Sequence, residues 1–393
     1  MVSWQQRANQ KQNQTDLSVL ANRQRAWVEI DLSALAHNVR SIKAWLSPKT
    51  KLMAVVKADA YGHGAVTVAQ TALANGADCL AIATLAEGVE LRQAGIDASI
   101  LILGAINAVE DIKAVAAWEL EPTICNVEQA LAFDATLATL GKSLNVHLKI
   151  DTGMSRLGTN WQAAVPFARL VQTLPHLRIE SVYSHLATAD EADRTTMNLQ
   201  QRRFAQAIAQ LQAIDIVPPQ IHLANSAATL GDRTTHYDLV RVGLALYGLY
   251  PAGYLRQQLE LKPVLEVKAK ITQVKTIPSG EGVSYGRQFV TNDTTKVAVV
   301  GIGYADGVPR NLSNQLQAIV KGKLVSQIGA ITMDQLMLDV NNLSDVKPGD
   351  IVTIIGQQGH LRITADDWAN KLYTISWEIL CGFKHRLPRI FNF

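Results

Sequence analysis

The chain has 393 residues, of which 48% are hydrophobic and 18% are charged. This length predicts two or three domains, and this balance of apolar and charged residues excludes a chain that is disordered throughout. The net charge of +3 is already reached in residues 1–26, which hold four basic residues and one acidic residue, so the rest of the chain is neutral overall. A neutral body argues against a protein that is dedicated to binding DNA or RNA.

Signals for export, membrane insertion and metal binding are missing from the sequence. No segment has 18 uninterrupted apolar residues, and the glutamine-rich N-terminus has no apolar signal region. The cysteines Cys79, Cys125 and Cys381 are odd in number and widely spaced, which argues against a disulfide framework and a Cys-x-x-Cys metal site. We therefore expect a cytoplasmic protein that holds no metal, binds no nucleic acid and contacts no membrane.

The N-terminal 24 residues are polar, and we expect residues 1–24 to form an extension outside the folded part. The ordered chain is expected to begin near Trp27, where the sequence WVEIDL alternates like a strand. Ser33 is a candidate N-cap for a helix that runs from Ala34 toward Trp45.

Short apolar runs recur after this helix and predict buried β-strands. Eight of them lie at residues 52–57, 79–84, 100–104, 122–125, 146–151, 179–185, 221–226 and 239–243. Their apolar residues are consecutive rather than alternating, which is typical of strands that are buried on both faces. Helical patterns separate many of them, so the sequence favours a TIM-like (β/α)8 barrel over residues 25–260. An open doubly wound sheet is the competing arrangement.

The hydrophobic pattern changes after about residue 260. Alternating segments such as VLEVKAKITQVKTI and TKVAVVGIGY appear there, and Gly, Pro, Asn and Asp separate them. Alternation of this kind is typical of antiparallel strands. We therefore predict a C-terminal, mostly antiparallel β domain over residues 261–393.

Polar residues stand where the predicted barrel strands end, and reactive groups of a barrel lie at those ends. Lys57 follows an apolar run, and a lysine held against apolar walls is a good Schiff-base former. A lysine that merely extends its amine to solvent is the alternative. Asn225 and Ser226, with the backbone of Gly243 and Leu244, could form a phosphate cup, although ordinary turn chemistry explains the same residues.

Two further strand-end residues have two interpretations each. Arg241 lies within an apolar run, so its guanidinium needs a partner, either a bound group or a carboxylate such as Asp238. His185 is either a core histidine with satisfied hydrogen bonds or a functional one.

Three further residues are also candidates for the site. Lys149 and Arg156 flank the sequence DTGMS, and they would repel each other if both faced one pocket, so one of them would have to be neutralised. Tyr285 lies between glycines in the predicted β domain, where it is either a packing residue or a group that moves protons.

Eight motifs together resemble the bacterial alanine racemases, which are fold-type III pyridoxal 5'-phosphate enzymes. They occur in order from AVVKADAYGHGA to MDQLML, with KIDTGMSRLG, YSHLATADE, HLANSAATL, RVGLALYGL, GEGVSYGRQF and GYADGVPR between. The resemblance runs from about residue 27 to Phe391. It implies racemisation of alanine, which supplies D-alanine for peptidoglycan, and a homodimer in which each active site is built from both chains.

The resemblance also implies a role for each matching residue. Lys57 would hold the cofactor covalently and serve as the base for the D-enantiomer, and Tyr285 of the partner would serve the L-enantiomer. Arg241 would contact the pyridine nitrogen, and His185 would help to set the proton affinity of Tyr285. The other implied cofactor contacts are Tyr61, Arg156, Asn225, Ser226, Gly243, Leu244 and Trp377. Arg156 and Met333 would bind the substrate carboxylate, and Lys149 would be carbamylated.

The sequence departs from the family pattern at two positions near the implied substrate pocket. Trp377 replaces a usual tyrosine, and Ala330 replaces a usual arginine. A racemase that also accepts serine or other small amino acids is therefore an alternative. A fold-type III amino-acid decarboxylase is a second alternative, and a pyridoxal-phosphate carrier without catalysis is a third.

Overall fold

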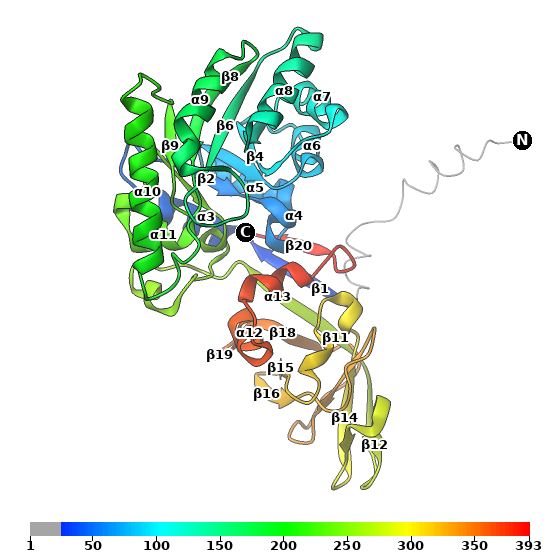
Figure 1. Ribbon diagram of the computed structural model, residues 1–393. Coiled ribbons are helices and arrows are strands. Elements are labelled where there is room, and N and C mark those ends of the chain that lie inside the picture. The colour runs from blue at the N-terminus through cyan, green and yellow to red at the C-terminus, as the bar shows by residue number, and fades with distance from the viewer. Residues whose placement is uncertain (1–24) are drawn as a thin grey trace, which may run out of the picture. The chain divides into compact units, whose positions relative to one another are not determined.

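The computed structural model describes residues 25–393 (Figure 1), so the expected extension at residues 1–24 lies outside the described part. The chain forms two compact units. The barrel unit comprises Asp31–Val264 with the last two residues, and the sheet unit comprises residues 25–30 with Leu265–Phe391. The domain boundaries that composition indicates, 25–260 and 261–393, stay predictions.

All eight apolar runs become parallel strands of the barrel unit. These strands are β2 (Lys51–Val55), β3 (Cys79–Ile82), β4 (Ile100–Ala105), β5 (Glu121–Ile124), β6 (Leu144–Asp151), β8 (Leu177–Tyr183), β9 (Gln220–His222) and β10 (Leu239–Val242). They pair in the order β10-β2-β3-β4-β5-β6-β8-β9. Two backbone bonds bring β10 back to β9, because Asp238 N–H donates to the Ile221 carbonyl and Arg241 N–H to the Ala224 carbonyl, both at 3.0 Å. The predicted TIM-like barrel is confirmed, and the open doubly wound sheet is wrong.

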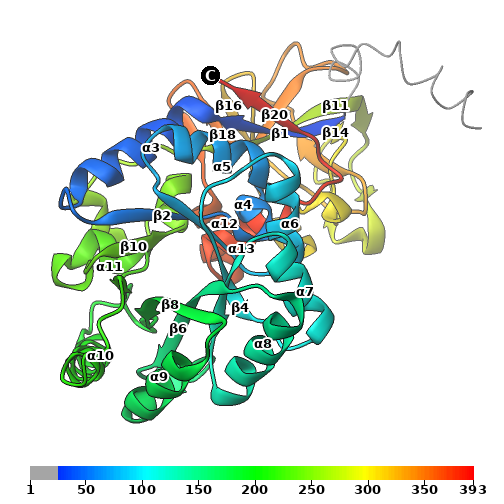
Figure 2. The same ribbon diagram turned by 90° about the horizontal axis from the view of Figure 1, so that it is seen from above.

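Helices surround the barrel strands, as the view in Figure 2 shows. They are α3 (Leu32–Trp45), α5 (Ala65–Ala74), α6 (Leu85–Gln93), α7 (Val109–Ala117), α8 (Val127–Leu140), α9 (Ala164–Thr173), α10 (Thr195–Gln212) and α11 (Ser226–Gly231). Because helices cover the outer faces and side chains fill the interior, strands such as β3 are buried at every position. The short strand β7 (Thr159–Asn160) pairs with β6.

The predicted cap of the first helix is wrong by two residues. Asp31 is the N-cap of α3, and its side chain accepts a hydrogen bond from Ala34 N–H at 2.8 Å. Asp and Ser are both good N-caps because each offers a side-chain oxygen to the free N–H groups of the first turn. The sequence places one of each there, and the earlier residue is the cap.

The sheet unit has the alternating strands that its sequence predicts. They are β1 (Ala26–Asp31), β11 (Leu265–Ile277), β14 (Thr295–Val300), β15 (Gln317–Val320), β16 (Lys323–Ser326), β17 (Leu336–Asp339), β18 (Ile351–Gln358), β19 (Leu361–Ile363) and β20 (Arg389–Asn392). The pairs of β11 with β1, β14 and β18 are all antiparallel. The expected strand at WVEIDL is therefore confirmed, and it belongs to this sheet rather than to the barrel. The predicted antiparallel domain is confirmed as a fold class.

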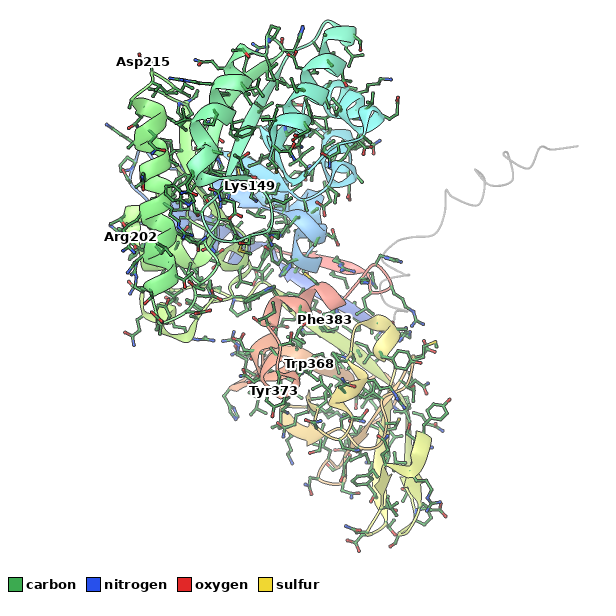
Figure 3. The ribbon with its side chains drawn as sticks, in the orientation of Figure 1. Lys149, Arg202, Asp215, Trp368, Tyr373 and Phe383 are labelled. Carbon is green, nitrogen blue, oxygen red and sulfur yellow. The ribbon has the colours of Figure 1, made fainter. Side chains whose placement is uncertain are left out.

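Smaller elements complete the sheet unit. A hairpin of β12 (Gly282–Val283) and β13 (Phe289–Val290) carries Tyr285. Helices α12 (Ala365–Leu372) and α13 (Ser376–Gly382) follow, and the rings of Trp368 and Phe383 pack there with centroids 6.0 Å apart (Figure 3). Between residues 25 and 393, the structure holds no helix that is long and apolar enough to cross a membrane.

Candidate active site

Lys57 begins an unusual turn that directly follows β2. It is the first residue of α4 (Lys57–Gly62), in which Ala58, Asp59, Ala60 and Tyr61 have φ angles of 53–55°. These are left-handed angles, which cost an L-residue other than glycine roughly 1–2 kcal/mol each. Four such residues in succession, none of them glycine, persist only where surrounding contacts hold them.

Glu87 supplies part of that support from helix α6. One carboxylate oxygen accepts a hydrogen bond from Ala58 N–H at 2.7 Å, and the other accepts from Ala83 N–H at 2.7 Å and Thr84 N–H at 3.1 Å. Sequence reasoning missed Glu87. The signal was present, because Thr84 and Glu87 form a capping box whose spacing can be read from the sequence.

A tight cradle lies beside this turn, where β10 ends. A β-carbon on Gly243 would lie only 2.8 Å from the hydroxyl oxygen of Tyr61, so a larger residue there would have to displace the Tyr61 side chain. The Ser226 hydroxyl accepts hydrogen bonds from Gly243 N–H at 3.1 Å and from Ala245 N–H at 3.4 Å. Tyr61 and Ser226 thus bring two hydroxyl groups beside the backbone of Gly243, and hydroxyl and N–H groups are the donors that bind a phosphate.

Two other predicted cup residues flank this cradle. Asn225 is the N-cap of α11, and its side chain accepts from Ala228 N–H at 3.0 Å. Leu244 begins the short 3-10 helix Leu244–Tyr247 and is buried. The structure therefore brings both ends of the predicted cup to one region of the barrel unit.

Arg241 is buried in the barrel and is held by neutral groups. It donates to His222 Nδ1 at 2.9 Å, to His185 Nδ1 at 3.1 Å, and to the carbonyl of Ser184 at 2.7 Å. The alternative of an ion pair with Asp238 is wrong, because the Asp238 carboxylate accepts from Ile221 N–H at 2.8 Å instead. Burial lowers the pKa of the Arg241 guanidinium to about 10, so it stays charged at neutral pH.

Several cations converge at this end of the barrel. The pKa of His185 lies well below its usual value. Burial is the main cause, followed by the charges of Arg241, Lys149, Arg156 and Lys57. Burial, followed by Arg241, lowers the pKa of Lys149 to about 8, even though neighbouring Cys125 and Asp151 oppose the shift. Lys149 is buried inside the barrel unit (Figure 3). The residues thus form a positively charged region that is suited to an anion.

The remaining predicted residues belong to the sheet unit. Tyr285 is 71% exposed on its hairpin, and the preceding Ser284 donates to the carbonyl of Ala330 at 2.7 Å. Met333 is exposed, and Trp377 lies half-buried on α13. A single chain therefore carries Lys57 and Tyr285 on different compact units.

Comparison with known proteins identifies the family. The model of the alanine racemase N-terminal domain matches residues 30–251, and the model of the alanine racemase C-terminal domain matches residues 264–391. The chain belongs to the alanine racemase family. The motif resemblance described above is therefore confirmed.

Relatives within the alanine racemase family cover almost the whole chain. An alanine racemase of Synechocystis sp. is 65% identical over 94% of this chain and 99% of its own length. An alanine racemase of Nostoc sp. is 63% identical over 93% of this chain and 96% of its own length. The solved alanine racemase of Bacillus anthracis with bound L-Ala-P has a TM-score of 0.89 at 36% identity, covering 94% of this chain and 95% of that one.

The alanine racemase family depends on pyridoxal phosphate, and the barrel residues fit that group. The cradle between Tyr61 and Gly243 offers donors for a phosphate, and Lys57 offers an amine for an aldehyde. Among residues 25–393, no cluster of three His, Cys, Asp or Glu side chains could hold a metal ion.

Proposed function

We propose that this chain interconverts L-alanine and D-alanine with pyridoxal phosphate held at the carboxyl end of the barrel strands, and so supplies D-alanine for peptidoglycan. The observation that carries the proposal is the cradle of Tyr61, Ser226 and Gly243 beside the turn of Lys57, with a buried cation at Arg241. Family membership supports the same reaction. We also propose that the protein works in the cytoplasm.

The residues around the cradle would each contact a different part of the cofactor. Tyr61, Ser226 and the N–H groups of Gly243 and Leu244 would bind the phosphate, which would replace the Ser226 hydroxyl as the acceptor of Gly243 N–H. Asn225 would order the helix behind them. Lys57 would bind the aldehyde carbon through its amine. When bound, pyridoxal phosphate supplies an electron-accepting ring, which lowers the energy needed to remove the Cα proton of alanine.

Arg241 would face the pyridine nitrogen and keep that nitrogen without a proton. Its support comes from imidazole nitrogens and a carbonyl rather than from a carboxylate, so the full positive charge is kept. A permanent cation opposes protonation of a nearby base. Arg241 would thereby limit how much charge the ring withdraws and would suppress side reactions such as transamination.

Racemisation requires two groups that handle a proton on opposite faces of Cα. Lys57 would remove or return the proton on the D face, and Tyr285 would do so on the L face with its phenol oxygen. Arg156 and the backbone N–H of Met333 would orient the substrate carboxylate, and His185 would tune Tyr285. Lys57 and Tyr285 would each move one proton, Arg156 and Met333 would hold the substrate, and His185 would act only through Tyr285.

The homodimer with shared sites is part of this proposal. Tyr285 and Met333 are both large and both more than half exposed on the sheet unit, at 71% and 53%. An exposed tyrosine on a hairpin can contact a neighbouring protomer, and Ser284 before it has a φ of 65°. We infer that Tyr285 and Met333 of one protomer complete the site of its partner.

Lys149 would carry a carbamate in the working enzyme. With a pKa of about 8, a fraction of its amine is neutral at physiological pH, and only the neutral amine attacks carbon dioxide. The modification turns a cation that repels Arg156 into an anion that pairs with it. Burial and the nearby charges of Arg241 and Arg156 all disfavour an ammonium group on Lys149, which supports this assignment.

The substrate range would be decided near Trp377 and Ala330. An indole keeps an aromatic wall but offers only one N–H donor, whereas the usual tyrosine both donates and accepts. Ala330 is buried and uncharged, whereas the usual arginine would place a cation at this position. A second candidate function is therefore a racemase that accepts serine besides alanine.

A panel of L-amino acids, incubated with the cofactor-loaded protein in D2O, tests the proposal. We expect D-alanine and deuterium at Cα, without release of CO2, and no reaction with Lys57→Ala. Comparable release of CO2 would instead support a fold-type III decarboxylase. Turnover of serine at a rate near that of alanine would support the broader racemase.

A further inference from the structure

A continuous line of hydrogen bonds connects Arg241 with a carboxylate at the other end of the barrel. Arg241 Nη1 contacts His222 Nδ1 at 2.9 Å, and His222 Nε2 contacts Ser181 Oγ at 2.8 Å. Ser181 Oγ contacts His147 Nδ1 at 2.6 Å, and His147 Nε2 contacts the Glu121 carboxylate at 2.9 Å. One residue comes from each of five successive strands of the barrel, β10, β9, β8, β6 and β5.

The two ends of this line determine its direction. An arginine can only donate hydrogen bonds, and an ionised carboxylate can only accept them. His222 Nδ1 must therefore be unprotonated, so His222 Nε2 carries the hydrogen and donates to Ser181. The Ser181 hydroxyl then donates to His147 Nδ1, and His147 Nε2–H donates to Glu121. Every hydrogen of the line has an acceptor in this arrangement, and both imidazoles are neutral.

A second proton on His147 would disrupt this order. His147 Nδ1–H and His222 Nε2–H would then both point at the Ser181 oxygen, and within the described residues the buried serine hydrogen would lose its acceptor. Ser181 and His222 are fully buried, so bulk solvent does not reach them to replace the lost partner. Burial, followed by the charge of Arg241, holds the pKa of His222 well below its usual value.

Glu121 is the end of the line that faces solvent. It is the first residue of β5, and its side chain is 17% exposed beside a surface hollow that Glu119, Lys142 and Arg178 also line. Burial raises the pKa of the Glu121 carboxyl, but hydrogen bonds from His147 and Ser99 outweigh burial, and its pKa lies below the usual value. Glu121 is therefore an anion at neutral pH.

This arrangement gives the buried Arg241 a distant counter-charge. Arg241 makes no ion pair within the described residues, and its two imidazole contacts are neutral acceptors. Hydrogen bonds in series polarise one another, and in a low-dielectric interior that polarisation carries further than in water. A negative charge at Glu121 strengthens the acceptor at His222 Nδ1 and so fixes the guanidinium in one orientation.

We propose that Glu121 is a positioning residue for the racemase reaction, acting through His147, Ser181 and His222 on the orientation and charge of Arg241. The part that concerns the cofactor depends on the function proposed above. The part that concerns the order of hydrogens depends only on the barrel. A purely structural polar network would keep its contacts without depending on the charge of Glu121.

Glu121→Gln is the decisive variant because it removes the charge and keeps an oxygen that can accept from His147. The matched control is Glu119→Gln, which removes an exposed carboxylate from the same surface hollow without touching the line. Glu121→Asp keeps the charge.

The first readout is the pH at which the absorption of the bound cofactor titrates in the holoenzyme. Loss of a negative charge disfavours protonation, so in Glu121→Gln this midpoint should fall by roughly half a pH unit to one unit.

The same variants are compared in kcat and KM. We expect kcat to fall roughly 3- to 30-fold in Glu121→Gln, with a smaller change in KM, as is typical when a supporting hydrogen-bond partner is removed. Glu119→Gln should match the wild type, and Glu121→Asp should recover at least part of the loss. A Glu121→Gln protein that matches Glu119→Gln in both midpoint and kcat would overturn the proposal.

A second measurement tests the order of hydrogens directly. In wild-type protein with 15N-labelled histidines, assigned by difference against His147→Gln, both His147 and His222 should be neutral with the hydrogen on Nε2 near pH 8. A hydrogen on His147 Nδ1 would contradict the proposed direction. If the wild type failed to bind pyridoxal phosphate or to racemise alanine, the proposed function would fail, while this measurement would still decide the order of hydrogens.

Discussion

The hydroxyl of Tyr61 lies 2.8 Å from the point that a β-carbon on Gly243 would occupy. Gly243→Ala should therefore displace Tyr61 and narrow the cradle, at a cost of about 1–3 kcal/mol in binding of pyridoxal phosphate. Equilibrium titration with the cofactor measures this loss. Gly253→Ala is the matched control, since a β-carbon there meets nothing within 4 Å. Equal affinities of the two variants would exclude the cradle as the phosphate site.

The left-handed turn after Lys57 should depend on Glu87. Glu87→Ala removes the acceptor of three backbone N–H groups, among them Ala58, and we expect a loss of roughly 1–3 kcal/mol in stability. The fraction of Lys57 that carries the cofactor should fall in the same variant. Denaturant unfolding and cofactor absorbance measure the two effects. Glu90→Ala, an exposed glutamate of the same helix, should change neither, and a similar loss there would show that Glu87 has no special role.

The eight barrel strands could be predicted from the sequence because their apolar residues are consecutive, and the strand ends led to most of the site. The left-handed turn could not be predicted, because Ala58, Asp59, Ala60 and Tyr61 carry no glycine signal. That conformation is imposed by tertiary contacts, which local propensity does not contain.

The partners of Arg241 were equally out of reach from sequence. The nearby Asp238 was the natural candidate, yet its carboxylate binds the Ile221 backbone. His222 stands on the adjacent strand, but which side chains face each other across two strands depends on their register, which local sequence patterns do not give.

Lys149 should make the stability of the unmodified protein depend on pH. Its folded pKa of about 8 lies below the ordinary value of 10.5, so the unfolded chain binds more protons between these values and stability should rise with pH there. Thermal unfolding of cofactor-free protein in CO2-free buffer from pH 7 to pH 10 measures this rise. Lys149→Met should flatten the curve.

Added bicarbonate distinguishes carbamylation of Lys149 from the titration of its amine. Added bicarbonate should raise the melting temperature of the wild type at pH 8 and leave Lys149→Met unchanged. A rise of equal size in both proteins would argue against a carbamate on Lys149.

Tyr285→Phe should separate the two proton transfers. The phenol oxygen is lost, but the ring and its packing remain, so cofactor affinity should be close to that of the wild type. Exchange of the Cα hydrogen with D2O should persist for D-alanine, where Lys57 acts, and should fall by about 10²- to 10⁴-fold for L-alanine. Tyr373→Phe, at a 98% exposed tyrosine, is the control. Undiminished exchange from L-alanine would remove Tyr285 from the reaction.

Asp306 should anchor the first strand of the sheet unit. Its carboxylate is buried and accepts two hydrogen bonds from Arg25, at 2.6 and 2.8 Å, besides one from Gly303 N–H at 2.9 Å. Asp306→Asn should reduce the free energy of unfolding by about 2–3 kcal/mol, because charged hydrogen bonds are lost. Chemical denaturation measures the change. Asp334→Asn, at an exposed carboxylate that pairs with Arg386, should cost much less.

The reversed twist of the backbone behind Lys57 has a consequence for how the protein is made. A nascent chain would not hold these four residues at left-handed φ angles. The contacts that stabilise this conformation, such as the hydrogen bond from Ala58 N–H to Glu87, form only in the folded barrel. The Lys57 amine is therefore held next to the Tyr61–Gly243 cradle only after the barrel has assembled. Specific uptake of the cofactor at this lysine thus requires a folded barrel.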